Sequence, residues 1–100
     1  MRQIVLLCNM GMSTSLMVSK MREAAENQGY ESEINAYALQ HAEEIAPEAD
    51  ILLVGPQIAF EIDRLKKEYP DKKIEAIEML DYGRMDGEKV LNHVKEVLGD

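Results

Sequence analysis

The sequence has few cysteines, few aromatic residues and few bases, and each shortage excludes a class of protein. Its one cysteine, Cys8, cannot form a disulfide within the chain, and one thiol with two distant histidines does not make a zinc site. Nineteen acids against 11 bases give a net charge of −8, without the stripe of Lys and Arg that nucleic-acid phosphates require. Four Tyr, one Phe and no Trp offer little to enclose a flavin. We therefore expect no nucleic-acid partner, no metal and no cofactor.

Long apolar runs are also missing. The longest, such as residues 4–7, are far shorter than the ~20 residues of a membrane span. Asn9 and Gly11 interrupt this first run too soon for the core of a signal peptide. Without an export signal or a disulfide pair, we predict a cytoplasmic protein that does not insert into the membrane. One hundred residues cannot close a second core, so residues 1–100 are predicted to form one domain.

Short apolar runs alternate with longer helical patterns along the chain. Continuous or alternating apolar residues predict strands at residues 3–7, 33–38, 50–54 and 73–79. Helical periodicity predicts helices at residues 13–28, 39–45, about 56–69, and from 86 onward. Gly29 is placed to end the first helix, Pro47 to end the second and Asp86 to cap the last. This order favours an α/β fold: a four-stranded parallel sheet in the flavodoxin-like order 2-1-3-4, with helices on both faces.

In such sheets a ligand binds beyond the carboxyl ends of the strands, where the strand order reverses, and the segment after the first strand lies there. Gly11 allows successive backbone N–H groups to point inward as an anion-binding nest, and Ser13 and Thr14 can cap the following helix. The helix N-terminus adds a partial positive potential, which suits a tetrahedral dianion and favours a thiolate at Cys8. The predicted phosphate-binding loop consists of Asn9, Met10, Gly11, Met12, Ser13, Thr14 and Ser15, with Cys8 as the nucleophile toward phosphorus.

Other interpretations of this segment stay open. Cys8 on its own could be one more apolar residue at a strand end. Low-molecular-weight tyrosine phosphatases have a similar strand, loop and helix, but their Arg six residues after the Cys is Thr14 here, and no Arg or Lys occurs between Gln3 and Ser19. Without that cation, we predict a carrier that holds a phosphoryl group with little loss to water. A module that binds a phosphorylated ligand non-covalently remains an alternative, and it would tolerate Cys8→Ser.

Three segments in order resemble the lactose/cellobiose-type enzyme IIB subunits of the sugar phosphotransferase system (PTS). They are Cys-x-x-Gly-Met-Ser-Thr-Ser at residues 8–15, Leu-Val-Gly-Pro-Gln-Ile-Ala at 53–59 and Tyr-Gly-Arg-Met-Asp-Gly at 82–87. Met10 departs from the small residue expected before Gly11, which changes the outer surface of the loop.

The resemblance implies a phosphotransferase that works between two partners. Cys8 would take a phosphoryl group from a phosphohistidine of a IIA protein and pass it to a sugar carried by a membrane IIC permease. The sugar would be a β-linked disaccharide such as cellobiose, chitobiose or lactose. Gln57 and Tyr82 are possible contacts with a partner. We expect a monomer that meets the membrane transiently through IIC.

Overall fold

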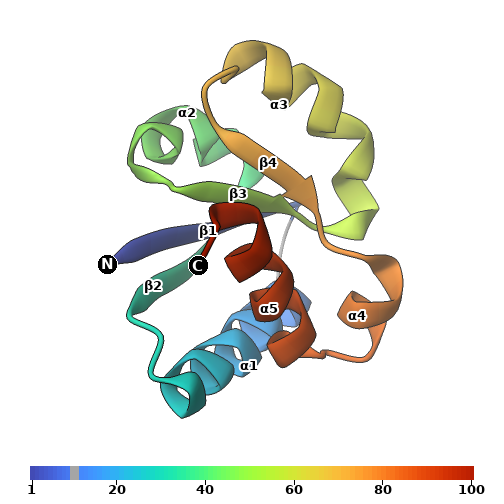
Figure 1. The fold of residues 1–100 in the computed structure, drawn as a ribbon. Helices are drawn as coiled ribbons and strands as arrows, with labels where there is room; N and C mark the ends of the chain where they lie inside the picture. The colour runs from blue at the N-terminus through green and yellow to red at the C-terminus, as the bar shows by residue number, and fades with distance from the viewer. Residues whose placement is uncertain (10–11) are drawn as a thin grey trace.

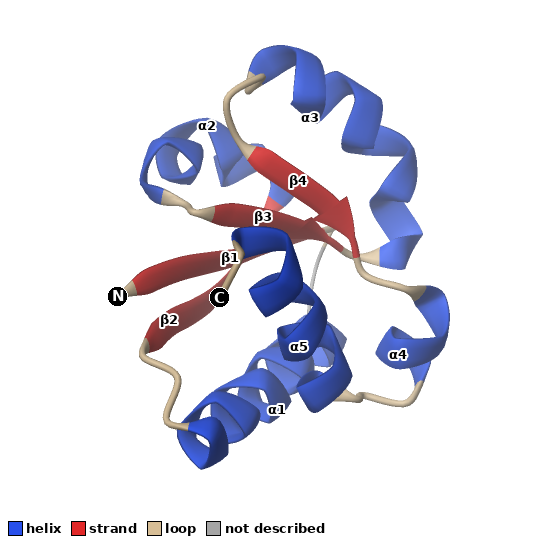
Figure 2. Cartoon of the chain, viewed as in Figure 1, coloured by secondary structure: helices blue, strands red, loops and turns tan. Residues whose placement is uncertain are grey.

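A four-stranded parallel sheet forms the centre of the computed structural model, which describes residues 1–9 and 12–100 (Figures 1 and 2). The strands are β1 (Arg2–Cys8), β2 (Ser32–Ala38), β3 (Ile51–Val54) and β4 (Lys73–Ala76). Their order is β2-β1-β3-β4, and every neighbouring pair is parallel. The predicted sheet and its order are confirmed.

Helices cover both faces of the sheet (Figure 1). One face carries α1 (Met12–Gln28), α4 (Met79–Gly83) and α5 (Gly87–Leu98). The other carries α2 (Ala42–Ile45), α3 (Ile62–Glu68) and three 3₁₀ segments, η1 (Leu39–His41), η2 (Ala46–Glu48) and η3 (Pro56–Glu61).

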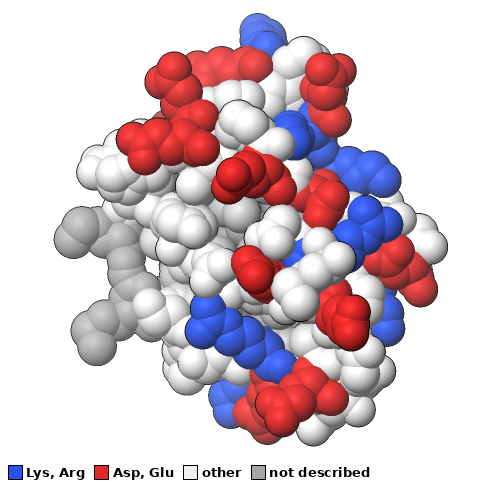
Figure 3. Space-filling model, turned by 90° about the vertical axis from the view of Figure 1, so that its left-hand side faces the viewer, with Lys and Arg blue, Asp and Glu red and all other residues white. Residues whose placement is uncertain are grey.

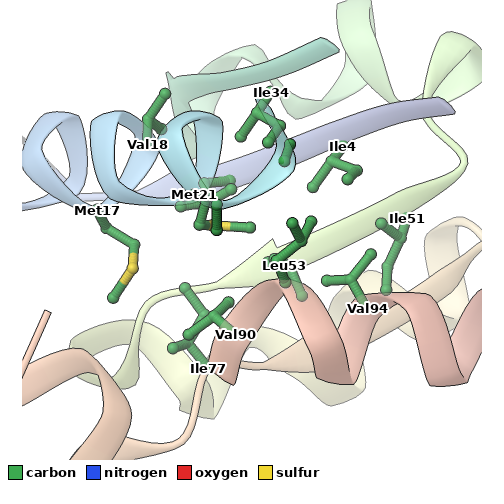
Figure 4. Close-up of a cluster of buried hydrophobic side chains, with 14 of the residues drawn as sticks. Ile4, Met17, Val18, Met21, Ile34, Ile51, Leu53, Ile77, Val90 and Val94 are labelled. Carbon is green, nitrogen blue, oxygen red and sulfur yellow. The ribbon is translucent and has the colours of Figure 1, made fainter. Parts of the chain in front are cut away.

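Side chains of β1, one of the two inner strands, alternate between two hydrophobic clusters. Ile4 and Leu6 pack toward α1 and α5, whereas Val5 and Leu7 pack toward α2 and α3. Figure 4 shows the first cluster, in which Met17 and Met21 of α1 lie near strand residues and α5. A strand buried on both faces has no polar alternation, which explains the continuous apolar run of β1. Burial of each such Leu or Ile side chain contributes about 1.5–3 kcal/mol to folding.

The C-terminus of α1 matches its prediction. Gly29 has a φ of +64°, a left-handed conformation that glycine adopts without steric cost. The Tyr30 N–H then donates to the Ala25 carbonyl at 2.9 Å, which closes the helix end. On the same helix, helical periodicity groups Leu16 with the apolar residues of the inner face, but its side chain is 48% exposed.

The second predicted helix ends before Pro47 as expected: α2 closes at Ile45, and Pro47 lies in the separate 3₁₀ segment η2. Two other predicted boundaries are wrong. The helix predicted from residue 56 is a 3₁₀ segment and an α-helix with a kink at Ile58. The fourth strand ends at Ala76, three residues before its predicted end, and residues 79–83 form α4, a helix that the sequence pattern does not predict.

Candidate functional site

Cys8 is the last residue of β1 and lies where the strand order reverses. It pairs with Ala38 of β2, and on the other side the Gly55 N–H donates to the Leu7 carbonyl at 3.1 Å. The Cys8 side chain is half-buried, and its Sγ lies 3.8 Å from the Tyr37 carbonyl oxygen, to which the thiol donates. The sulfur is thus fixed between two neighbouring strands at the carboxyl edge of the sheet and remains partly accessible.

The 17-residue helix α1 begins four residues after Cys8. Its first turn carries no acidic side chain that would neutralise the partial positive charge of the helix N-terminus. This arrangement favours an anion beside Cys8. Asn9 and Ser15 are exposed at this edge. The predicted nest at Met10 and Gly11 lies outside the described residues, as do the side chains of Met12 and Ser13, so the amide cradle stays a prediction.

Thr14 has a different environment from the one expected of a loop hydroxyl. Its side chain is only 3% exposed, and its Oγ1 lies 3.1 Å from the hydroxyl of Tyr82. Tyr82 belongs to α4 and is 6% exposed within the core cluster beneath α1. A contact of Tyr82 with a partner stays a prediction, but its position favours support of the first turn of α1. Nothing in the sequence links these residues, since 68 positions separate them.

Gln57, the second predicted partner contact, is exposed in η3 just after β3. A Cβ atom built on Gly55 would come within 3.0 Å of Gln57 Oε1 and 3.9 Å of the Leu7 carbonyl oxygen. The Gln57 side chain therefore folds back over Gly55, next to the end of β1. Glycine at this position lets the polar side chain approach the edge that carries Cys8.

Two surface features adjoin this edge. An open groove of about 700 Å³ runs from Asn9 between the η1–α2 segment and α3, and its charged lining residues are Glu43, Arg64 and Glu68. Phe60 and Met79, which follow the carboxyl ends of β3 and β4, are 78% and 74% exposed. Both side chains stand on segments that leave the sheet at the same edge as Cys8.

Each of the two histidines lies close to a carboxylate. His41 ends η1 with its ring 4.0 Å from a Glu44 carboxylate oxygen, and His93 of α5 lies 3.0 Å from Glu75. Within residues 1–9 and 12–100 no three His, Cys, Asp or Glu side chains gather to hold a metal ion. In that same part of the chain, each helix is too short or too polar to cross a bilayer.

Acidic and basic side chains are intermixed on the face shown in Figure 3, and this face shows no continuous basic stripe. The absence of a nucleic-acid partner stays a prediction from the sequence.

Residues 3–93 match the family model described as "PTS system, Lactose/Cellobiose specific IIB subunit". The chain is 45% identical to the oligo-beta-mannoside-specific EIIB component of Bacillus subtilis, over 89% of this chain and 88% of the relative. It is 42% identical to the cellobiose-specific EIIB component of Lactococcus lactis subsp. lactis, over 88% of each. The solution structure of the cellobiose-specific IIB component from Borrelia burgdorferi superposes with a TM-score of 0.82 at 34% identity, covering 98% of this chain and 92% of that one.

Proposed function

Because the chain belongs to the lactose/cellobiose-specific IIB family of the PTS, whose members are phosphotransferases acting on sugars, we propose that Cys8 carries its phosphoryl group. The observation that supports this assignment is the position of the sulfur. Cys8 is a half-buried thiol at the strand-order reversal, just before the N-terminus of a long helix without acidic side chains in its first turn.

The reaction consists of two in-line transfers. In the first, the Cys8 thiolate attacks the phosphorus of a phosphohistidine on a IIA partner; the P–S bond forms, the P–N bond breaks and the imidazole leaves. In the second, a sugar hydroxyl held by a IIC permease attacks phosphorus, its proton is released to water, and the P–S bond breaks to regenerate the thiolate. Positioning and hydrogen bonds to the equatorial oxygens supply most of the catalysis.

The loop binds the phosphoryl group through uncharged donors, the backbone N–H groups of residues 9–15 and the hydroxyls of Ser13, Thr14 and Ser15. The bound group brings roughly −1.5 to −2 charges, by analogy with other phosphorylated side chains. Hydrogen bonds to such an anion are shorter and stronger than neutral ones. The loop therefore tightens around the phosphoryl group.

A carrier is favoured over a phosphatase because no Arg or Lys occurs between Gln3 and Ser19 to stabilise attack by water. Arg22 lies well along α1, where its guanidinium donates to the Ile34 carbonyl and to the Asn35 side chain. A non-covalent binding module is less favoured because it gives the half-buried Cys8 sulfur no chemical role.

Mass spectrometry of the protein after incubation with a phosphorylated IIA protein tests the assignment. We expect one phosphoryl group on Cys8 in the wild type and none on the Cys8→Ser variant. Label on His41 or His93 with an unmodified Cys8 would overturn it. Retained transfer by Cys8→Ser would favour the non-covalent module instead.

The sugar is proposed at the level of a β-linked disaccharide, such as cellobiose, chitobiose or lactose. The two relatives named above are described for oligo-beta-mannosides and for cellobiose, although both are over 40% identical to this chain. Selection of the sugar therefore belongs mainly to the IIC partner. Phosphorylation of a sugar panel in vesicles with the cognate IIA and IIC proteins distinguishes the candidates.

A further inference from the structure

The corner between α4 and α5 packs closely against α1 and accounts for the sequence Tyr-Gly-Arg-Met-Asp-Gly at residues 82–87. Gly87, the first residue of α5, lies so close to α1 that an added Cβ would be 2.4 Å from the Lys20 carbonyl carbon. Asp86 accepts a hydrogen bond from the Lys89 N–H at 3.1 Å and caps α5. Met85 has a φ of +53°, a conformation that non-glycine residues adopt only when the surrounding structure enforces it.

This corner fixes the backbone on both sides of Tyr82. The Tyr82 N–H donates to the Glu78 carbonyl at 2.9 Å, and the Tyr82 carbonyl accepts from Met85 at 3.1 Å. The ring is buried in the cluster beneath α1. Because the backbone is held and the ring is packed, the hydroxyl is preplaced against Thr14 before any ligand arrives.

The two hydroxyls of this contact differ in chemistry. Either oxygen of this contact could be the donor. Because a phenol is the stronger acid and its oxygen the poorer acceptor, we take Tyr82 as the donor and Thr14 Oγ1 as the acceptor. The Thr14 proton is then directed toward a second acceptor. Thr14 lies in the first turn of α1, and strand alternation places Cys8 on the same side of the sheet as α1.

We propose that Tyr82 is a positioning residue for phosphoryl transfer, because its hydrogen bond to Thr14 orients the Thr14 hydroxyl toward the phosphoryl group on Cys8. This inference rests on the proposed function of Cys8. It explains the third segment of the family resemblance, since the corner holds Tyr82 against Thr14 in the first turn of α1. Tyr82 acts through Thr14 and does not touch the reacting atoms.

Rapid-mixing kinetics with a phosphorylated IIA protein test the proposal on the Tyr82→Phe variant. We expect the rate constant of transfer to Cys8 to fall about threefold to tenfold, the range of one neutral hydrogen bond. The KM for the donor should stay unchanged, since the hydroxyl is buried away from a docked protein. The phosphorus NMR resonance of the phosphocysteine should also move, because one donor to its oxygens is lost or misaligned.

A double-mutant cycle shows whether the effect passes through Thr14. The double variant Thr14→Val/Tyr82→Phe should transfer the phosphoryl group almost as fast as Thr14→Val alone. Thr14→Ser, which keeps the hydroxyl, should retain most of the wild-type rate. If Tyr82→Phe does not fold, the comparison of Thr14→Val with Thr14→Ser still decides. Equal rates of these two variants would contradict the proposal.

Tyr30→Phe is the matched control, since it removes a tyrosine hydroxyl bonded to Asp100 near the chain termini, away from Cys8. It should leave the transfer rate and the phosphorus resonance unchanged. A raised KM with an unchanged rate constant for Tyr82→Phe would assign Tyr82 to partner contact and overturn the proposal. Wild-type rates in Tyr82→Phe would overturn it while leaving Cys8 as carrier, whereas a wild-type protein that accepts no phosphoryl group would overturn both.

Discussion

Asp100 connects the two ends of the chain through its carboxylate. Arg2 donates to it at 2.9 and 3.0 Å from two nitrogens, and Tyr30 donates from its hydroxyl. The hydrogen bonds from Arg2, and next from Tyr30, lower the pKa of Asp100 to about 2. Burial and the bond to Asp100 raise the pKa of Tyr30 to about 12. The folded state thus favours an ionised Asp100 and a neutral Tyr30.

These shifts predict how stability depends on pH. The contribution of Asp100 is present above its ordinary pKa of 3.8 and is lost as the pH falls through about 2. The contribution of Tyr30 is present below pH 10.0 and is lost as the pH rises through about 12. Urea unfolding should find Asp100→Asn less stable than the wild type at neutral pH, with the difference vanishing toward pH 2. Asp71→Asn, at an exposed turn, should show no such convergence, and a constant difference for Asp100→Asn would refute the argument.

Individual residues of the site are predictable only where their surroundings are local. The sequence correctly places Cys8 at the end of a buried strand, because apolar runs and helical periods are short-range signals. It places Thr14 in the phosphate-binding loop at the start of a helix but does not show its contact with Tyr82, because Tyr82 comes from a distant helix and only packing brings them together. Helical periodicity assigns Leu16 to the buried face of α1, but the side chain is exposed. The period identifies which face of a helix is apolar, but not how far along the helix other elements cover that face.

At the scale of elements, the strands and the long helices are predictable and the short helix α4 is not. A strand shows its apolar run or its period of two within a few residues, and α1 and α5 are long enough to show the longer period of a helix. The five-residue helix α4 is not, and alternating apolar residues before it lengthen the predicted fourth strand to Met79. Although β4 has ended, the Ile77 N–H still donates to the Val54 carbonyl at 2.9 Å, so the backbone stays beside β3 for one more residue.

The close contact between α1 and α5 gives a prediction on stability. Gly87→Ala should lower the free energy of unfolding by about 1–3 kcal/mol, because its Cβ would overlap the backbone at Lys20 and Met21. Urea denaturation measures the change. Gly83→Ala is the matched control: this helical glycine has open space around its Cβ position, so alanine should be neutral or add about 0.5–1 kcal/mol. Equal effects of the two substitutions would contradict the packing argument.

At the scale of the whole molecule, the carboxyl edge combines Cys8, the proposed phosphoryl carrier, with exposed apolar side chains. The segment after β3 and helix α4 lie toward the same end of the sheet, to which the strand arrows point (Figure 2). Phe60 and Met79 stand on these two segments. A phosphohistidine reaches Cys8 only if its protein covers this edge, so we expect the IIA partner to bury both side chains.

Truncating these side chains should therefore weaken docking without slowing the chemistry. Phe60→Ser and Met79→Ser should each raise the KM for phosphorylated IIA about fivefold, because losing a buried interface anchor costs about 1 kcal/mol or more. The rate constant from bound donor should not change, in contrast to the result expected for Tyr82→Phe. The free energy of unfolding should move by no more than about 0.5 kcal/mol, since both side chains are exposed. The control is Asn27→Ser, a neutral substitution at an exposed position near the end of α1, remote from Cys8, which should leave the KM unchanged. An unchanged KM in all three variants would mean that the donor approaches Cys8 over another surface.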